Sequence, residues 1–319
     1  MSAGRRRALV TGGAGFIGSH LAERLVREGW EVRVLDDFST GREENLADVR
    51  GRIELLRGDL RDRALVARGV AGAELVFHHA AIPSVPRSVE DPLRSDAVNV
   101  HGTLGLLESA RAAGVRRVVF AASCAAYGDG GDLPKREDAA VRPASPYALQ
   151  KYVGERYCRL YSELFGFPTV ALRYFNVFGP RQNPDGDYAA AIPRFIRACL
   201  RGEPPRIFGD GAQTRDFVYV DDVIGANLLA AEAEPAVGSV VNVASGVETS
   251  VNELVEAVRG LTGFAGQAVY APRRVGDVER SVADIGAARA LLGWAPTVSL
   301  REGLRRTIAS FRAAGGMAA

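Results

Sequence analysis

A glycine-rich turn near the N-terminus constrains the fold of this chain more than any other feature. The stretch "ALVTGGAGFIGSHLAERL" places Gly12, Gly15 and Gly18 between an apolar run and an amphipathic segment. The first glycine permits a tight turn, the second lets the backbone approach a pyrophosphate, and the third lets a helix pack closely on the preceding strand. The pattern therefore predicts a strand, a turn and a helix that together bind a dinucleotide.

Short apolar runs alternate with helical patterns through the first half of the chain. The runs are "RALV", "EVRVLD", "IELLRGD", "AELVFHHAA", "RRVVFAAS" and "PTVALRYF". Such alternation indicates a parallel sheet with helices on both faces. We expect an α/β fold: a doubly wound parallel sheet of the Rossmann type with a smaller α/β substrate-binding lobe. The rhythm changes after Phe178, which predicts a first domain over residues 1–178 and a second over residues 179–319, with some later strands returning to the first sheet.

Composition argues against several classes of protein. The 319 residues carry a net charge of +2, so nothing suggests nucleic acid as a partner. No run reaches the roughly 18 apolar residues of a membrane span, and the basic N-terminus lacks the apolar stretch of a signal peptide, so we expect no membrane association and a cytoplasmic location. Three widely spaced cysteines and four histidines without ligand spacing favour neither disulfides nor a metal site.

Two aspartates follow predicted strands at the same edge of the sheet. Asp36 ends "EVRVLD", at the distance expected of a carboxylate that binds the ribose hydroxyls of a dinucleotide. It would repel a 2'-phosphate, which favours NAD over NADP. Asp59 ends the third run, and either contacts the adenine or caps the next helix.

The stretch "SPYALQKYVGE" holds one of only two lysines in a chain of 40 basic residues. Ser145 and Pro146 are typical of a helix start, which places Tyr147 and Lys151 four residues apart on one helical face. Tyrosine has a reference pKa of about 10, and a nearby ammonium would favour its anion. Lys151 can serve both the phenol and a ribose, for which an arginine fork fits less well. Ser123, at the end of "VVFAAS", completes the candidate group.

With these motifs the sequence resembles the extended short-chain dehydrogenase/reductases, and within them the UDP-hexose 4-epimerases, over nearly its whole length. It looks closest to the subgroup that acts on UDP-N-acetylglucosamine. The resemblance implies an isomerase that epimerises carbon 4 of a UDP-sugar through a transient 4-keto sugar, with NAD recycled in place. Ser123, Tyr147 and Lys151 would be catalytic. It also implies a homodimer that pairs helices of the first domain, including the helix after Pro146.

The resemblance assigns further residues through "FHHAAIP", "VNVHGT", "LRYFNVFGPRQ", "IFGDGAQTRDFVYVDDV" and "RRVGDVERS". The implied NAD-binding residues are Gly12, Gly15, Phe16, Ile17, Gly18, Asp36, Asp37, Asp59, Leu60, Ala80, Ala81, Asn99, Tyr147, Lys151 and Tyr174. Phe175 would flank the nicotinamide together with Tyr174. The implied substrate-binding residues are Ser123, Asn176, Phe208, Arg215, Arg274, Asp277 and Ser281. The small Ser281 would leave space for an acetamido group on carbon 2 of the sugar.

Three alternatives stay open. Ala125 cannot supply the extra acid or base that related dehydratases and decarboxylases need, so both reactions are disfavoured. Cys124 is either a small buried thiol or an acid/base for epimerisation at carbon 3 or 5. A UDP-glucuronate 4-epimerase shares nearly every motif, although Asn176 weighs against it. A non-catalytic dinucleotide sensor would also fit the fold, but it would have no need of Ser123, Tyr147 and Lys151.

Overall fold

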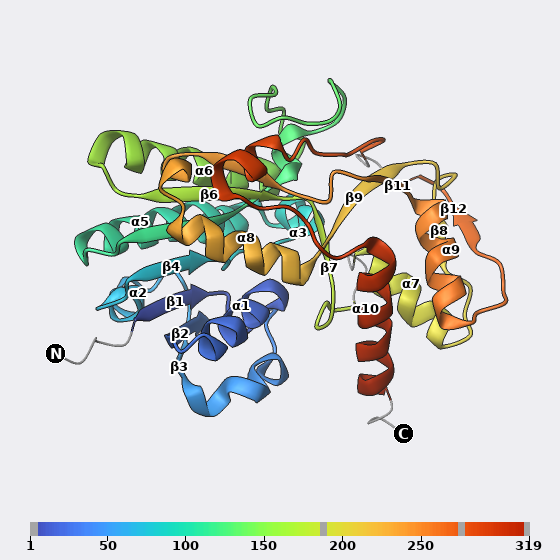
Figure 1. The fold of residues 1–319 in the computed structure, drawn as a ribbon, viewed down its shortest axis with the longest axis horizontal. Coiled ribbons are helices and arrows are strands. Elements are labelled where there is room, and N and C mark those ends of the chain that lie inside the picture. Colours follow the sequence, from blue (N-terminus) through green and yellow to red (C-terminus); the bar gives the residue numbers. More distant parts are fainter. Residues whose placement is uncertain (1–5, 186–189, 274–277, 316–319) are drawn as a thin grey trace.

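The computed structural model describes residues 6–185, 190–273 and 278–315, which form an α/β fold (Figure 1). A seven-stranded sheet has the order β10-β6-β5-β4-β1-β2-β3, and every neighbouring pair is parallel. The order reverses between β1 and β4, which is the switch point of a doubly wound sheet. The strands are β1 Arg7–Thr11, β2 Glu31–Asp36, β3 Ile53–Arg57, β4 Leu75–His78, β5 Arg117–Ser123, β6 Thr169–Tyr174 and β10 Val240–Val243.

Helices cover both faces of this sheet. Helices α1 and α8 contact each other on one face, while α2, α5 and α6 form the other layer. The longer helices are α1 Phe16–Arg27, α2 Arg63–Val70, α5 Thr103–Ala112, α6 Pro146–Phe165 and α8 Val220–Glu232. Shorter helical segments are η1 Glu43–Arg52, α3 Val85–Glu90, α4 Pro92–Asp96, η2 Ala97–Gly102, η3 Cys124–Tyr127, η4 Glu234–Ala236 and η5 Ala288–Leu292. The predicted fold class is confirmed.

A smaller lobe carries two short sheets and three helices, drawn at the right of Figure 1. One sheet has the order β11-β9-β7, and the other pairs β12 with β8. The elements are β7 Asn176–Phe178, α7 Ala191–Leu200, β8 Arg206–Phe208, β9 Thr214–Tyr219, β11 Glu248–Ser250, α9 Val251–Thr262, β12 Val269–Ala271 and α10 Leu300–Gly315. Because α8 and β10 return to the large sheet between elements of this lobe, the division at residue 178 stays a prediction.

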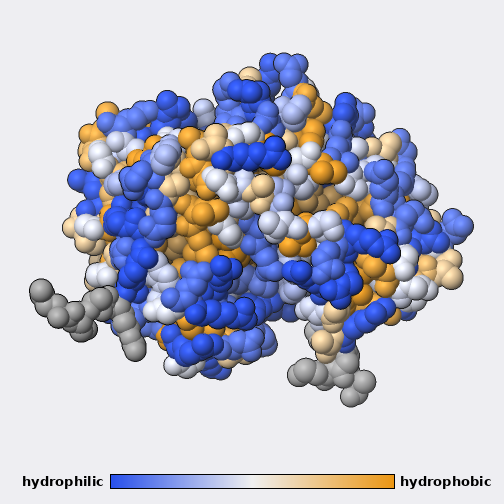
Figure 2. Space-filling model, viewed as in Figure 1, coloured by the Kyte–Doolittle hydropathy of each residue, from blue (hydrophilic) through white to orange (hydrophobic). Residues whose placement is uncertain are grey.

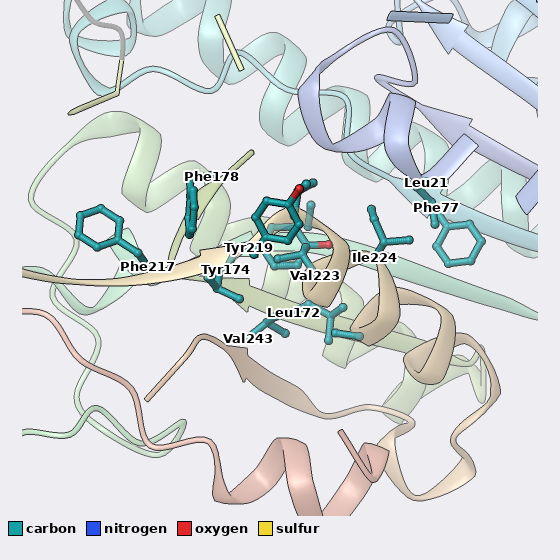
Figure 3. Close-up of a cluster of buried hydrophobic side chains, with 14 of the residues drawn as sticks. Leu21, Phe77, Leu172, Tyr174, Phe178, Phe217, Tyr219, Val223, Ile224 and Val243 are labelled. Atoms are coloured by element: carbon teal, nitrogen blue, oxygen red, sulfur yellow. The ribbon is translucent and has the colours of Figure 1, made fainter. Parts of the chain in front are cut away.

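The two lobes share one hydrophobic core. Figure 3 shows Leu21 and Phe77 of the first domain near Ile224 of α8, and Phe178 close to Tyr219 of the smaller lobe. The ring centroids of Phe178 and Tyr219 are 5.6 Å apart. Burial of these apolar side chains therefore stabilises the lobes together.

The glycine turn has the predicted geometry. Gly12 has φ 66, a left-handed conformation, and a Cβ there would lie 2.7 Å from the Ala80 nitrogen. A Cβ on Gly18 would collide with the Gly12 carbonyl, so this glycine is needed where α1 packs on the turn.

Hydrophilic and hydrophobic residues are interleaved over the face drawn in Figure 2. Within residues 6–185, 190–273 and 278–315, none of the helices has the length and apolar content needed to span a membrane.

Candidate active site

A large cavity of about 1050 Å³ opens at the carboxyl ends of the parallel strands. Its lining includes fourteen of the fifteen residues predicted to bind NAD, from Gly12 in the glycine turn to Tyr174 at the end of β6. Asn99 is the exception. Its side chain accepts a hydrogen bond from the Ile82 nitrogen at 2.8 Å and donates to Gln150 of α6 at 2.9 Å. The structure therefore corrects the expected direct contact: Asn99 supports the wall of the cavity from behind.

Asp36 is buried at the end of β2, with an exposed fraction of 6%. Its carboxylate accepts hydrogen bonds from the Ala14 and Phe38 nitrogens, both at 2.8 Å. Burial raises the pKa of Asp36, and these two hydrogen bonds oppose the shift. The carboxylate is thus fixed against the glycine turn, as a ribose ligand would need to be.

Asp59 lies on the same edge and lines the same cavity. It does not cap α2, because the cap is Asp62, whose carboxylate accepts from the Ala64 and Leu65 nitrogens. Asp59 instead pairs with Arg61 at 2.6 Å, and this hydrogen bond lowers the pKa of Asp59. The helix-cap interpretation of Asp59 is wrong.

Helix α6 begins as the sequence predicts. Ser145 accepts a hydrogen bond from the Ala148 nitrogen at 3.2 Å, and proline occupies the first turn. The Tyr147 nitrogen donates to Ser88 of α3 at 3.0 Å. These contacts fix the start of the helix that carries Tyr147 and Lys151, both of which line the cavity.

Tyr147 and Ser123 interact directly. Loss of hydration raises the pKa of Tyr147 to about 12, and a hydrogen bond from Ser123 opposes the shift. Ser123 lies at the end of β5, in register with Tyr174 of β6. Its hydroxyl also accepts a hydrogen bond from the Ala125 nitrogen at 3.2 Å. The side chain of Ser123 is therefore held beside the phenol.

Lys151 does not have its predicted effect on the phenol in this arrangement. Its Nζ donates to the Ala121 carbonyl at 2.8 Å, and it is absent from the groups that shift the pKa of Tyr147. Burial lowers the pKa of Lys151 to about 8, so its charge is weakly held. The electrostatic help predicted for Tyr147 is thus not provided by these protein groups alone.

The residues after β5 and β6 face different ways. Tyr174 lines the cavity, stacks on His79 with ring centroids 6.1 Å apart, and donates to Asn227 at 2.9 Å. Phe175 packs instead against Tyr127, with centroids 6.2 Å apart, and does not line the cavity. The predicted nicotinamide contact therefore holds as a possibility for Tyr174 only.

Cys124 follows Ser123 directly. Burial raises its pKa to about 12, with a further contribution from the charge of Asp216. Cys124 is a thiol at neutral pH and is poorly suited to accept a proton.

A smaller cavity of about 230 Å³ adjoins the large one, because Gln182 and Ala190 line both. Its lining includes three predicted substrate residues, Asn176, Phe208 and Arg215. Ser281 is half-buried and lines neither cavity. The other two predicted substrate residues, Arg274 and Asp277, lie outside the described residues.

Several lining residues escaped the sequence reasoning. Gln182 and Arg181 follow β7 in a loop, and Arg181 pairs with Glu23 of α1 at 2.6 Å. Arg194 of α7 lies over the Phe208 ring, 5.3 Å from its centroid. The amphipathic stretch "PRFIRACLRGE" signalled a helix, but nothing in it signalled that Arg194 would face a cavity. Among the described residues, no cluster of three or more His, Cys, Asp or Glu side chains could hold a metal ion.

Comparison with known proteins supports this geometry. Residues 8–244 match the model of the NAD dependent epimerase/dehydratase family. The chain belongs to this family. UDP-glucose 4-epimerase of Mycolicibacterium smegmatis is 44% identical over 310 residues, which cover 96% of this chain and 98% of that protein.

Two solved structures of family members are similar over nearly their whole length. UDP-N-acetylglucosamine 4-epimerase from Methanobrevibacter ruminantium, in complex with UDP-N-acetylmuramic acid, is 38% identical with a TM-score of 0.93, and the match covers 97% of this chain and 99% of that one. UDP-glucose 4-epimerase of Thermus thermophilus, in complex with NAD, is 41% identical with a TM-score of 0.88 and the same coverage. This family uses NAD, so the cofactor predicted from Asp36 and the glycine turn agrees with the comparisons.

Proposed function

We propose that this protein is an NAD-dependent UDP-sugar 4-epimerase. The observation that carries the proposal is the meeting of two cavities beside one catalytic group. Tyr147, Lys151 and Tyr174 line the large cavity, Ser123 contacts Tyr147, and Asn176 lines the small cavity only two residues after Tyr174. A sugar that reaches from the small cavity would meet the Tyr147 phenol at the large one.

The large cavity fits NAD by its own chemistry. The absence of a Cβ at Gly12 leaves the backbone open where a pyrophosphate would lie at the start of α1. The fixed carboxylate of Asp36 suits two ribose hydroxyls and repels a 2'-phosphate. Lys151 and Tyr174 would border the nicotinamide end.

Each catalytic side chain has a distinct role. Ser123 would hold the 4-hydroxyl of the sugar by a hydrogen bond, and Tyr147 would take its proton and later return it. NAD, when bound, accepts a hydride from carbon 4 and gives it back, so the net redox change is zero. For Tyr147 to act as the base, its pKa must fall from about 12, at about 1.4 kcal/mol per unit. A cationic ring and a protonated Lys151 near the phenol would both lower it.

The small cavity supports a uridine diphosphate as the handle. Phe208 offers a ring face to the base, and Arg215 a guanidinium that can bind phosphate oxygens through paired hydrogen bonds. Asn176 is held by its hydrogen bond to the Asp216 carbonyl at 3.0 Å, which leaves its amide oxygen available to accept. These groups account for a UDP-sugar rather than a free sugar.

We infer that the enzyme accepts acetamido sugars as well as plain hexoses, because Ser281 is small. The variant Ser281→Tyr should lower kcat/KM for UDP-N-acetylglucosamine at least about ten-fold, a loss of about 1.4 kcal/mol, while UDP-glucose is little affected. Equal activity of the variant and the wild type on the acetamido sugar would overturn this inference.

The reaction itself is tested by product analysis. The purified protein is incubated, without added reductant, with UDP-N-acetylglucosamine, UDP-glucose and UDP-glucuronate in parallel, and products are followed by proton NMR. We expect 4-epimers from the first two substrates and none from Tyr147→Phe. An epimer from UDP-glucuronate alone would make the protein a uronate epimerase. No epimer in any tube would leave a sensor as the better interpretation.

We also propose that the protein is a homodimer through α6. Leu149 and Leu164 are 51% and 69% exposed on this helix, and Phe165 is 53% exposed at its end. Exposed leucines repeated along one helix are costly in water unless a partner covers them. Leu164→Arg should shift the protein from dimer to monomer in sedimentation, whereas Leu229→Arg on α8 should not. A wild-type monomer at micromolar concentration would refute the proposal.

A further inference from the structure

Residues 279–284, called here the 279–284 segment, are held by both lobes. On one side the Thr214 nitrogen of β9 donates to the Glu279 carbonyl at 2.9 Å. On the other side Lys135, in the loop that follows η3, donates from its nitrogen to the Val282 carbonyl at 2.8 Å and accepts from the Asp284 nitrogen at 2.9 Å. This segment carries Ser281.

One carboxylate anchors the segment from within. Asp216 of β9 has no exposed surface. Its Oδ1 accepts from the nitrogen and the hydroxyl of Ser245, at 2.7 and 2.6 Å. Its Oδ2 accepts from the nitrogens of Gly246 and Ala283, at 2.9 and 3.2 Å. A carboxylate removed from water needs such donors, so the three chain segments that supply them are fixed around it.

The same residue adjoins the candidate substrate site. Its carbonyl accepts the hydrogen bond from Asn176, and its neighbour on β9 is Arg215. Its charge also reaches Cys124, directly after Ser123. Asp216 therefore connects the small cavity, the loop after β5 and the 279–284 segment.

We propose that Asp216 is a positioning residue for recognition of the sugar. By holding Ala283, it fixes Ser281 relative to Asn176 and Arg215, and so controls the fit of the sugar while the nucleotide keeps its own contacts. This inference rests on the proposed function, because it takes the sugar of a UDP-sugar as the recognised group.

Asparagine is the sharpest probe of this role. Asp216→Asn keeps the shape but leaves one acceptor oxygen, and its NH2 group would face the N–H groups of Gly246 and Ala283. Two of the four hydrogen bonds are then lost, and the 279–284 segment is released. Ser245→Ala is a milder variant that removes the hydroxyl donor alone, and it serves if Asp216→Asn does not fold.

Asp222 offers a matched control. It is also buried, at 5% exposed, and its carboxylate accepts from the nitrogen and hydroxyl of Thr297 and from the Val298 nitrogen. It lines neither cavity. Asp222→Asn should therefore cost similar stability without touching the site.

The experiment measures binding of UDP and of UDP-N-acetylglucosamine to the NAD-loaded proteins by calorimetry, with melting temperatures in parallel. We expect Asp216→Asn to weaken the UDP-sugar about ten-fold while the Kd of UDP changes less than about two-fold. Ser245→Ala should shift the same ratio by a smaller factor, and Asp222→Asn should leave it unchanged although its melting temperature falls.

An unchanged ratio in Asp216→Asn, or an equal change in Asp222→Asn, would overturn the inference. The proposed function fails separately if the wild type binds the UDP-sugar but forms no 4-epimer, because the binding ratio still tests Asp216. A wild type that binds neither ligand would refute both.

Discussion

At the scale of single residues, the thiol of Cys124 separates epimerisation at carbon 4 from chemistry at neighbouring carbons. Because its pKa is raised to about 12, it should not act as a base at neutral pH. Cys124→Ala should keep the epimerase rate within about three-fold of wild type, whereas Tyr147→Phe should lose at least about a hundred-fold, the usual scale for removing an acid/base group. Initial rates at pH 7.5 decide between the two residues. A loss with Cys124→Ala comparable to that of Tyr147→Phe would contradict the roles assigned here.

Lys151 gives a prediction about stability and pH. Its folded pKa of about 8 lies below the unfolded value of 10.5, so the unfolded chain binds more protons between these values and stability rises with pH there. The buried charge therefore costs most stability below pH 8. Lys151→Met should gain stability relative to wild type at pH 7, and the difference should shrink by pH 10. Urea unfolding at both pH values measures this, and a difference that grows with pH would show the sign to be wrong.

The identity of Lys151 also explains why a lysine persists among so many arginines. Its head is buried, at 4% exposed, against the Ala121 carbonyl, where a planar guanidinium has little room. Lys151→Arg should lose NAD binding, measured by fluorescence titration. Lys135→Arg, at the other buried lysine, should retain it because that side chain lines neither cavity. Equal retention by both variants would remove the special role of Lys151.

At the scale of elements, a buried ion pair joins α6 to β6. Glu155 and Arg173 are each 2% exposed and form two hydrogen bonds of 2.6 and 2.7 Å. Glu155→Gln would leave the Arg173 charge buried without its partner, which should cost about 3–5 kcal/mol of unfolding free energy. The exposed pair of Arg159 and Glu163 on the same helix is the control, and Glu163→Gln should cost less than about 1 kcal/mol. Similar costs for the two variants in urea unfolding would refute this account.

The elements show what the sequence reveals and what it hides. All six apolar runs in the first half became strands, and α6 began at Ser145, because these signals are local. The three-residue strands β7, β8, β11 and β12 were not predicted, since each depends on a partner far along the chain. The direction of Asn99, the cap at Asp62 and the facing of Phe175 also depend on packing that no short motif records.

At the scale of the whole molecule, the site exists because two lobes with a shared core bring two cavities together. The glycine turn and the Tyr147 motif located the first cavity from sequence alone. Gln182 and Arg194 were missed because they line a cavity only after the smaller lobe folds beside the sheet. Asp216 was missed for the same reason: its four donors come from segments up to 67 residues away.

The measurement that tests the central claim most directly follows the hydrogen on carbon 4. A UDP-sugar carrying deuterium at carbon 4 is converted by the NAD-loaded protein in ordinary water, and the product is analysed by NMR. The account predicts that the 4-epimer keeps its deuterium at carbon 4 and gains no solvent hydrogen at carbons 3 or 5. Loss of the deuterium to solvent, or exchange at carbon 3 or 5, would contradict a 4-keto route with recycled NAD and would turn attention to Cys124.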